Sequence, residues 1–415
     1  MKIGGARGGV AVRDQGDEQD LKLNLHRYLV ESIEEDEVEL SSWVRGAVLE
    51  YVREKVAQYV AGHQLPLTQM DLDRLAEDLV DELTGLGPLQ ALLSDPSVSE
   101  ILVNGAQHIV VEREGRLEET DRRFIDDAHV RRVIERILAP LGRRLDEASP
   151  MVDGRLPDGS RVNAVIPPVA MDGPSISIRK FKADPLQGRD LVVYGTLNEE
   201  LLSFLRNAVE RRANILVSGG TSTGKTTLLN VLSGFIGDSE RVVTIEDTGE
   251  LQLGHRHVVR LETRPPNVEG FGEVTARDLV KNALRMRPDR IVLGEVRGDE
   301  VMDMMQAMNT GHDGSMSTIH ANSASDALLR MEALFGMAGR QIQEATVRQM
   351  IGAAVDVIVQ LVRLPNGRRC ISEVAEVVSV RDGHYVTNVL FELDRAHDRI
   401  VHREGAPASG KLRRN

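Results

Sequence analysis

Apolar residues recur at helical spacing in the N-terminal part of the chain. The first stripe is Trp43, Ala47, Val48, Tyr51, Val52, Val56, Tyr59 and Val60, and the second, after Asp71, is Leu72, Leu75, Leu79 and Leu83. Residues 1–20 are Gly-rich, polar and aperiodic, which predicts a disordered segment. We therefore expect a helical region over 21–88. Its amphipathic faces leave open whether these helices pack within their own domain or dock a partner.

The hydrophobic period changes near residue 89. Residues 100–104, 108–113, 161–166 and 175–181 alternate as strands do, and a helical stripe follows Asp127. In the last of these strands Ile176 and Ile178 share one face and Arg179 lies on the other. This pattern predicts a small α+β domain over 89–185, followed by a linker over 186–197.

From residue 198 onward, a helix at 198–211 leads into apolar strands that alternate with helices to about residue 380. Such alternation is typical of an α/β fold with a mostly parallel, doubly wound sheet. We expect this domain to span 198–395 and to be followed by a flexible tail over 396–415.

Composition narrows the choice of environment. The net charge of -13 over 415 residues gives no general attraction to nucleic acid or anionic lipid. Cys370 is the single cysteine, which excludes an intrachain disulfide and a Cys-rich zinc module and fits a reducing compartment. The chain shows neither a run of 18 apolar residues nor the apolar region of a signal peptide. We therefore expect a cytoplasmic protein that reaches a membrane only through partners.

The strongest motif is GGTSTGKT at 219–226, which matches G-x-x-x-x-G-K-[ST] between a strand at 214–218 and a helix at 227–232. Its glycines let backbone N–H groups face phosphates, and the helix N-terminus adds positive potential. Lys225 is expected to reach the β- and γ-phosphates and Thr226 to ligate Mg²⁺. The expected nucleotide-binding residues are Gly219, Gly220, Thr221, Ser222, Thr223, Gly224, Lys225, Thr226 and Thr227. The alternative is a Gly-rich turn that binds nothing.

Two apolar strands end in acids. RVVTIED at 241–247 places Glu246 at a strand end, where it can orient or activate the attacking water. RIVLGEVR at 290–297 carries Gly294 and Glu295 where a P-loop strand usually ends in Asp. Glu295 is a candidate to bind Mg²⁺ through water or to act on the nucleophile. In the alternative interpretation the first pair of carboxylates merely begins a turn.

The segment GHDGSMSTIHAN at 311–322 holds His312 and His320. A single histidine is usually structural, but one beside a phosphate loop can hydrogen-bond the terminal phosphate and distinguish ATP from ADP. Upstream, we expect Asp299 to cap a Met-rich helix whose methionines fill a core.

Together, GGTSTGKT, TIEDTGEL, IVLGEVRGDE and GHDGSMSTIHAN resemble the type II/type IV secretion ATPase superfamily. DGRLPDGSRVNAVIPP followed by SISIRKF is similar to the CpaF-type ATPases of Tad/Flp (type IV) pilus machines. The resemblance implies a PAS-like N-terminal domain, a RecA-like P-loop ATPase domain and a hexameric ring.

The resemblance also assigns roles to individual residues. Lys225 and Thr226 would hold phosphate and Mg²⁺, Glu246 would be the Asp-box acid, Glu295 the Walker B acid and His320 the His-box histidine. Arginines of the N-terminal domain would contact the nucleotide phosphates, where their fixed charge suits the transition state. The candidates are Arg161 and Arg179, then Arg143, Arg144 and Arg155.

The implied activity is hydrolysis of Mg-ATP to ADP and phosphate by a homo-hexameric motor. Its partners would be a polytopic inner-membrane platform protein and pilus machinery at the inner face of the cytoplasmic membrane, without direct contact to nucleic acid. One alternative is a RecA-like nucleic-acid translocase, which the acidic balance disfavours. The other is a nucleotide-switched scaffold that binds ATP without appreciable turnover.

Overall fold

The computed structural model describes residues 15–40, 43–113, 115–141, 143–181, 186–266, 270–339, 342–403, 407–409 and 411–412. The chain forms two compact units, Met1–Phe181 and Lys182–Asn415. Of the segment 1–20 predicted to be disordered, residues 1–14 lie outside the described residues, and helix α1 begins at Gln15. None of the described helices is both long and apolar enough to span a membrane.

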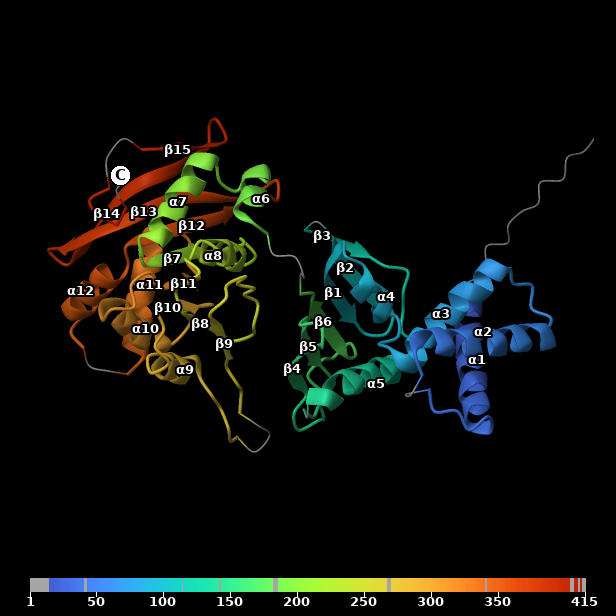
Figure 1. Ribbon diagram of the computed structural model, residues 1–415. Helices are drawn as coiled ribbons and strands as arrows, with labels where there is room; N and C mark the ends of the chain where they lie inside the picture. The colour runs from blue at the N-terminus through green and yellow to red at the C-terminus, as the bar shows by residue number, and fades with distance from the viewer. Residues whose placement is uncertain are drawn as a thin grey trace, which may run out of the picture. The chain divides into compact units, whose positions relative to one another are not determined.

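The first unit begins with three helices, α1 (Gln15–Glu35), α2 (Arg45–Gly62) and α3 (Gln69–Thr84) (Figure 1). A capping box between Thr68 and Asp71 starts α3. The predicted apolar stripes are confirmed, because Val52 and Val56 of α2 and Leu79 of α3 are buried in one cluster. This burial favours packing within the unit over a dedicated docking role.

The same unit contains an antiparallel sheet in the order β3-β2-β1-β6-β5-β4. Its strands are β1 (Val98–Asn104), β2 (His108–Arg113), β3 (Arg116–Glu119), β4 (Met151–Arg155), β5 (Arg161–Val165) and β6 (Ser175–Arg179). Helices α4 (Leu89–Ser94) and α5 (Asp127–Leu138) share its core. The alternation predicted for the last strand is confirmed, since Ile176 and Ile178 are fully buried and Arg179 is exposed.

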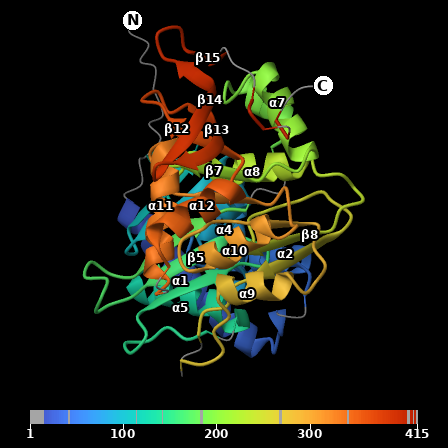
Figure 2. The same cartoon turned by 90° about the vertical axis from the view of Figure 1, so that its left-hand side faces the viewer.

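In the second unit, nine strands of the described residues form one sheet in the order β15-β14-β13-β12-β7-β11-β10-β8-β9. They are β7 (Ile215–Gly219), β8 (Val242–Glu246), β9 (Val258–Glu262), β10 (Arg290–Leu293), β11 (Met316–Ile319), β12 (Val357–Arg363), β13 (Arg369–Arg381), β14 (His384–Asp394) and β15 (Arg399–His402). Strands β12 through β9 pair in parallel, and β13 to β15 add antiparallel neighbours. Figure 2 shows β13, β14 and β15 on one side of β7 and β8 on the other. Every residue of β7, β8, β10 and β11 is buried, as expected of parallel strands covered on both faces.

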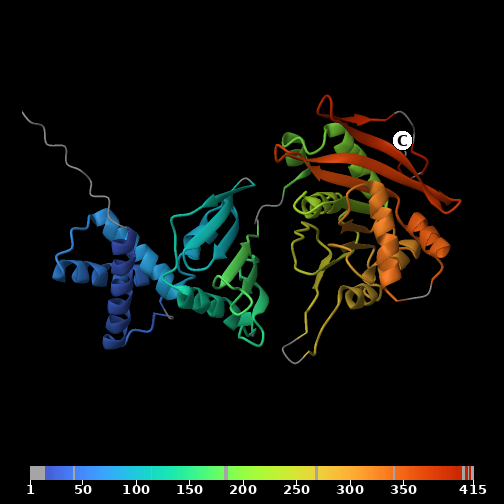
Figure 3. The same ribbon diagram turned by 180° about the vertical axis from the view of Figure 1, so that it is seen from behind.

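Helices cover both faces of this sheet (Figures 1 and 3). One face holds α6 (Gly188–Val193), α7 (Glu199–Glu210) and α8 (Lys225–Ser233), and the other holds α9 (Ala276–Ala283), α10 (Glu300–Asn309), α11 (Ala324–Met337) and α12 (Glu344–Ala354). Ile215 and Val217 of β7 join the first cluster and Leu216 the second, so successive side chains of one strand serve both cores. The doubly wound α/β arrangement follows directly.

Two local predictions differ from the structure, and a third is confirmed. The predicted linker contains α6, which a capping box between Gln187 and Asp190 starts. Asp299 occupies the N-cap position of α10 but makes no capping bond, because its carboxylate accepts a hydrogen bond from Arg277 (2.6 Å) instead. The methionine prediction is confirmed, since Met304 and Met305 of α10 are fully buried.

The predicted flexible tail 396–415 also contains ordered structure. It includes β15, and Leu412 is buried in the core beside α7 and α8. Lys411 Nζ pairs with Asp313 (2.8 Å) and Asp356 (3.1 Å). One apolar side chain and one ammonium group thus hold a segment that composition alone marks as polar and basic; residues 404–406, 410 and 413–415 lie outside the description.

Candidate nucleotide site

The Gly-rich loop lies between β7 and α8, as its motif predicts. Ser222 (φ 57°) and Gly224 (φ 97°) both have left-handed backbone, which curls the loop ahead of the helix N-terminus. Lys225, only 7% exposed, donates from Nζ to the carbonyl oxygen of Gly220 (2.9 Å). The loop thus holds the cation against its own backbone, around a space where phosphate oxygens can replace that carbonyl.

Gly219 is required by close packing. A Cβ atom there would lie 2.6 Å from Thr223 Oγ1 and 2.8 Å from the backbone oxygen of Leu361 on β12. Thr223 itself donates to the Gly220 carbonyl (2.9 Å), so a shift of its hydroxyl would disturb the loop. The first glycine of the motif therefore fits the loop against the neighbouring strand.

Parallel pairing brings three predicted residues together at one edge of the sheet. Strand order β7-β11-β10 places the loop, His320 and Glu295 side by side at their carboxyl ends. Lys225 Nζ lies 3.3 Å from His320 Nε2, and that same nitrogen lies 3.2 Å from Glu295 Oε1. Burial lowers the pKa of His320 below its ordinary value, with Lys225 adding to the effect and Glu295 opposing it. His312 precedes β11 and so belongs to the opposite edge.

Glu246 ends β8, which is the next strand along this edge. Its Oε2 accepts hydrogen bonds from the backbone N–H groups of Glu250 (2.7 Å) and Leu251 (2.8 Å). The turn interpretation of this acid therefore has structural support. Burial nevertheless dominates, and raises the pKa of Glu246 to about 7. A carboxyl group that is half ionised near neutral pH can exchange a proton with water.

Gly294 explains the unusual end of β10. A Cβ atom at this position would lie 3.2 Å from Glu246 Cγ, and the Gly294 N–H donates to the Ile245 carbonyl (2.8 Å). An aspartate there would crowd the Glu246 side chain. The glycine lets the two strand ends approach and leaves Glu295, one residue later, to face His320.

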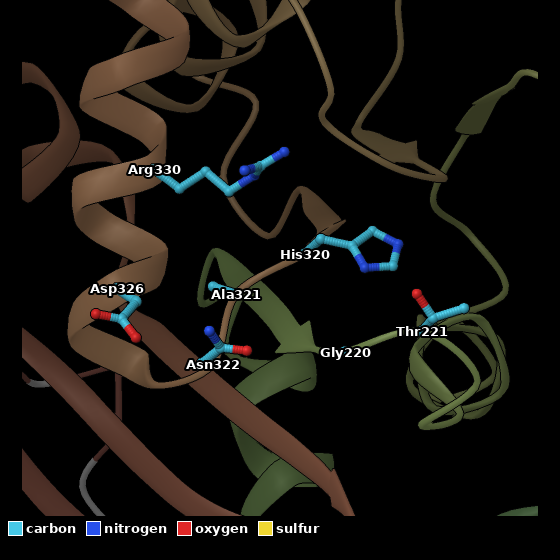
Figure 4. A pocket seen from close by; sticks show the side chains of 7 residues that line it. All are labelled: Gly220, Thr221, His320, Ala321, Asn322, Asp326 and Arg330. Carbon is cyan, nitrogen blue, oxygen red and sulfur yellow. The ribbon is translucent and has the colours of Figure 1, made fainter.

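A cavity of about 540 Å³ opens beside this cluster (Figure 4). Gly220, Thr221, His320, Ala321, Asn322, Asp326 and Arg330 line it. The His320 ring extends toward Thr221, and Arg330 projects from α11 (Figure 4). Sequence reasoning missed Asn322, Asp326 and Arg330; the i,i+4 spacing of Asp326 and Arg330 on the helix after the histidine segment was the available signal.

The arginine candidates belong to the first unit. Arg161 of β5 and Arg179 of β6 are register partners, and Arg179 also pairs with Glu100 of β1. Arg155 donates to the Gly159 carbonyl (3.1 Å) and lies 5.9 Å from the Phe181 ring centroid. Arg144 lies 3.9 Å from Asp146, and Arg143 donates to the Asp153 carbonyl. Arg155 of β4 is in turn the register partner of Arg161, so three of the five candidates lie across adjacent strands of this sheet.

The residues beside the loop could hold Mg²⁺, which binds to few protein ligands in phosphate sites. Among the residues that the structure describes, no three His, Cys, Asp or Glu side chains converge on a possible metal position. Thr226 supplies a half-buried hydroxyl at the start of α8, and Glu295 supplies a carboxylate. Oxygen ligands few in number, completed by phosphate and water, are what Mg²⁺ prefers.

Comparisons with known proteins agree with this geometry. The family model described as "Type II/IV secretion system protein" matches residues 82–388. A Mycobacterium tuberculosis protein named "Putative conjugal transfer protein" is 40% identical over 323 residues, which cover 76% of this chain and 91% of that protein. The conjugal transfer protein TrbB of Rhizobium radiobacter is 35% identical over 318 residues, covering 76% and 94%.

A solved structure shares the fold. The pilus retraction motor PilT with bound ADP aligns with a TM-score of 0.52 at 20% identity, over 72% of this chain and 81% of that chain. The family match alone spans more than half of the residues. The chain therefore belongs to the type II/IV secretion system protein family, and it is an ATPase of that family.

Proposed function

We propose that ATP binds with its phosphates on the loop 219–226 and its terminal phosphate toward Lys225 and His320. The observation that carries this proposal is the Lys225–His320–Glu295 cluster. The buried Lys225 Nζ lies 3.3 Å from His320 Nε2, and this nitrogen lies 3.2 Å from Glu295 Oε1. Phosphoryl transfer depends mainly on such positioning and charge.

In the proposed reaction, a water oxygen attacks the γ-phosphorus while the bond to the β,γ-bridging oxygen breaks, giving ADP and phosphate. Glu246 takes the proton of this water, for which a pKa of about 7 is well matched. Glu295 orients the water, and His320 hydrogen-bonds the terminal phosphate. Mg²⁺, held by Thr226 and through water by Glu295, would neutralise phosphate charge.

We also propose Arg161 and Arg179 as phosphate-binding residues. Both guanidinium groups carry fixed charge and come from adjacent strands of one sheet. Replacing either by Ala is expected to lower kcat while loop binding of ADP persists. Equal kcat in the variants and the unchanged protein would remove them from the site.

At the level of the machine, we propose a CpaF-type ATPase of a Tad/Flp pilus, with a PAS-like domain before a RecA-like domain in a homo-hexamer. It would act at the cytoplasmic face of the inner membrane on a polytopic platform protein. The DGRLPDGSRVNAVIPP and SISIRKF segments support the pilus assignment, and the names of the relatives favour a secretion or conjugation machine as the second candidate. Loss of pili but not of conjugation on deletion of the gene would separate the two.

The direct test is phosphate release by the purified full-length chain with Mg-ATP. Lys225→Ala is expected to abolish turnover, and Glu246→Gln or Glu295→Gln to retain ATP binding while slowing hydrolysis. Full activity of Lys225→Ala would refute the assignment. Stimulation by DNA or RNA would instead indicate a translocase, and ATP binding with negligible turnover beside the membrane partner would indicate a scaffold.

A further inference from the structure

The Arg297 guanidinium joins the acidic ends of two strands. Its Nη2 donates to Glu295 Oε2 (2.7 Å), which follows β10, and its Nη1 donates to Asp247 Oδ2 (3.1 Å), which follows β8. These strands are direct neighbours in the sheet. The guanidinium group is planar and carries N–H donors on both terminal nitrogens, so it is suited to hold two carboxylates in fixed positions.

The backbone under this bridge is firmly anchored. The carboxylate of Glu300, itself buried, accepts from the N–H groups of Arg297 (2.6 Å) and Gly298 (2.8 Å). The Val296 N–H donates to the Thr318 carbonyl of β11 (2.9 Å). The backbone of Arg297 is therefore held in place, although 58% of its side chain is exposed.

Electrostatics favours the bridge. Glu295 raises the pKa of Arg297 above its ordinary value, and Asp247 and Glu250 act in the same direction. Without the guanidinium, the carboxylates of Glu295 and Asp247 would face each other across adjacent strand ends as like charges. Their separation and the orientation of Glu295 thus depend on Arg297.

The bridge gains importance when nucleotide binds. In the structure, Glu295 is held on both oxygens, by His320 on Oε1 and by Arg297 on Oε2. In the proposed function, Lys225 and His320 turn to the terminal phosphate, which weakens the first contact. Arg297 then remains as the contact that keeps Glu295 in place for the attacking water.

We propose that Arg297 is a positioning residue for ATP hydrolysis, which orients Glu295 by anchoring it to Asp247. Asp247 thereby acquires a role in the reaction through its hydrogen bond from Arg297, beside the one it accepts from Thr263 Oγ1 (3.4 Å). The inference rests on the proposed function, because it requires Glu295 to work on the water or the metal.

The test measures kcat, the KM for ATP and the Kd of a fluorescent ADP analogue for full-length variants. Arg297→Ala is expected to lower kcat on the order of 10- to 100-fold, as loss of an orienting partner does, while the Kd for ADP stays within about twofold. Asp247→Asn should lower kcat less. Arg297→Lys should recover only part of the loss, since one ammonium group does not span both carboxylates.

The double variant is decisive. If Arg297 acts through Asp247, Arg297→Ala with Asp247→Asn should be no slower than Arg297→Ala alone. Arg285, an exposed arginine two residues after the end of α9, provides the matched control: Arg285→Ala also removes one positive charge and should leave kcat unchanged.

Three outcomes would overturn the inference: unchanged kcat in Arg297→Ala, multiplicative losses in the double variant, or a kcat loss that merely follows loss of folding or ring assembly in melting and sizing experiments. Lys225→Ala separates this result from failure of the proposed function. If Lys225→Ala is inactive while Arg297→Ala is fully active, only the role of Arg297 fails; if Lys225→Ala is active, the proposed site itself fails.

Discussion

Replacing Glu246 by Gln is expected to change how stability depends on pH. Burial raises the pKa of this carboxyl group from 4.5 to about 7 in the folded chain. Between these two values the folded state binds more protons than the unfolded state, so the free energy of unfolding falls as pH rises through the window. At about 1.4 kcal/mol for each pKa unit, the loss from Glu246 is about 3 kcal/mol.

Glutamine keeps an amide oxygen that can accept from the Glu250 and Leu251 N–H groups, but it has no proton to lose. At pH 5, where Glu246 is protonated in the folded state, Glu246→Gln should be about as stable as the unchanged chain. At pH 8 it should be more stable by up to about 3 kcal/mol.

The assay is urea unfolding of the nucleotide-free full-length chain, followed by circular dichroism between pH 5 and pH 8. Leu251→Ala is a useful comparison, because it keeps both the carboxyl group and the backbone donor and should retain the pH slope. Parallel slopes for Glu246→Gln and the unchanged chain would refute the argument, since they would mean that Glu246 does not carry its charge at a buried position.

Three further substitutions test the packing. Gly219→Ala is expected to weaken ATP binding and to destabilise the chain by about 1–3 kcal/mol, because the added Cβ atom would meet Leu361. An unchanged affinity for ATP in titration calorimetry would contradict this. Gly314 has φ 81°, and a Cβ atom added there would lie 2.6 Å from Arg290 Nη1, so Gly314→Ala should lower the melting temperature through about 1–3 kcal/mol of strain. Gly311 also has a positive φ but lies in open space, so Gly311→Ala is the milder control. Leu412→Ala should cost about 2–5 kcal/mol in urea unfolding; a change near zero would mean that the C-terminal segment does not dock in solution.

The local pattern of hydrophobic and polar residues predicted much of the fold. The strands at 100–104 and 108–113 and the helix at 198–211 were predictable because alternation with period 2 and stripes with period 3.6 follow from which face each element buries. The strand, loop and helix around residues 219–226 were equally predictable, because phosphate binding restricts residue types within eight consecutive positions.

Local pattern failed where a distant partner decides the outcome. Asp299 follows the sequence rule for a helix cap, yet Arg277 from another helix takes its carboxylate. The segment around Leu412 is polar in composition, yet one apolar side chain reaches the core and Lys411 finds two acids far away in the sequence.

By itself, the sequence determined that this chain has a phosphate-binding loop, two strands that end in acidic residues and a histidine segment, because each of these features consists of consecutive residues. Only the tertiary structure showed that His320 lies against Lys225 and Glu295, that Gly294 makes room for Glu246, and that Arg297 spans to Asp247. The physical reason is strand order. Paired residues of neighbouring parallel strands lie from 16 (Val242 and Val258) to 142 (Ile215 and Val357) positions apart in the chain, and no spacing rule reports which strand lies beside which.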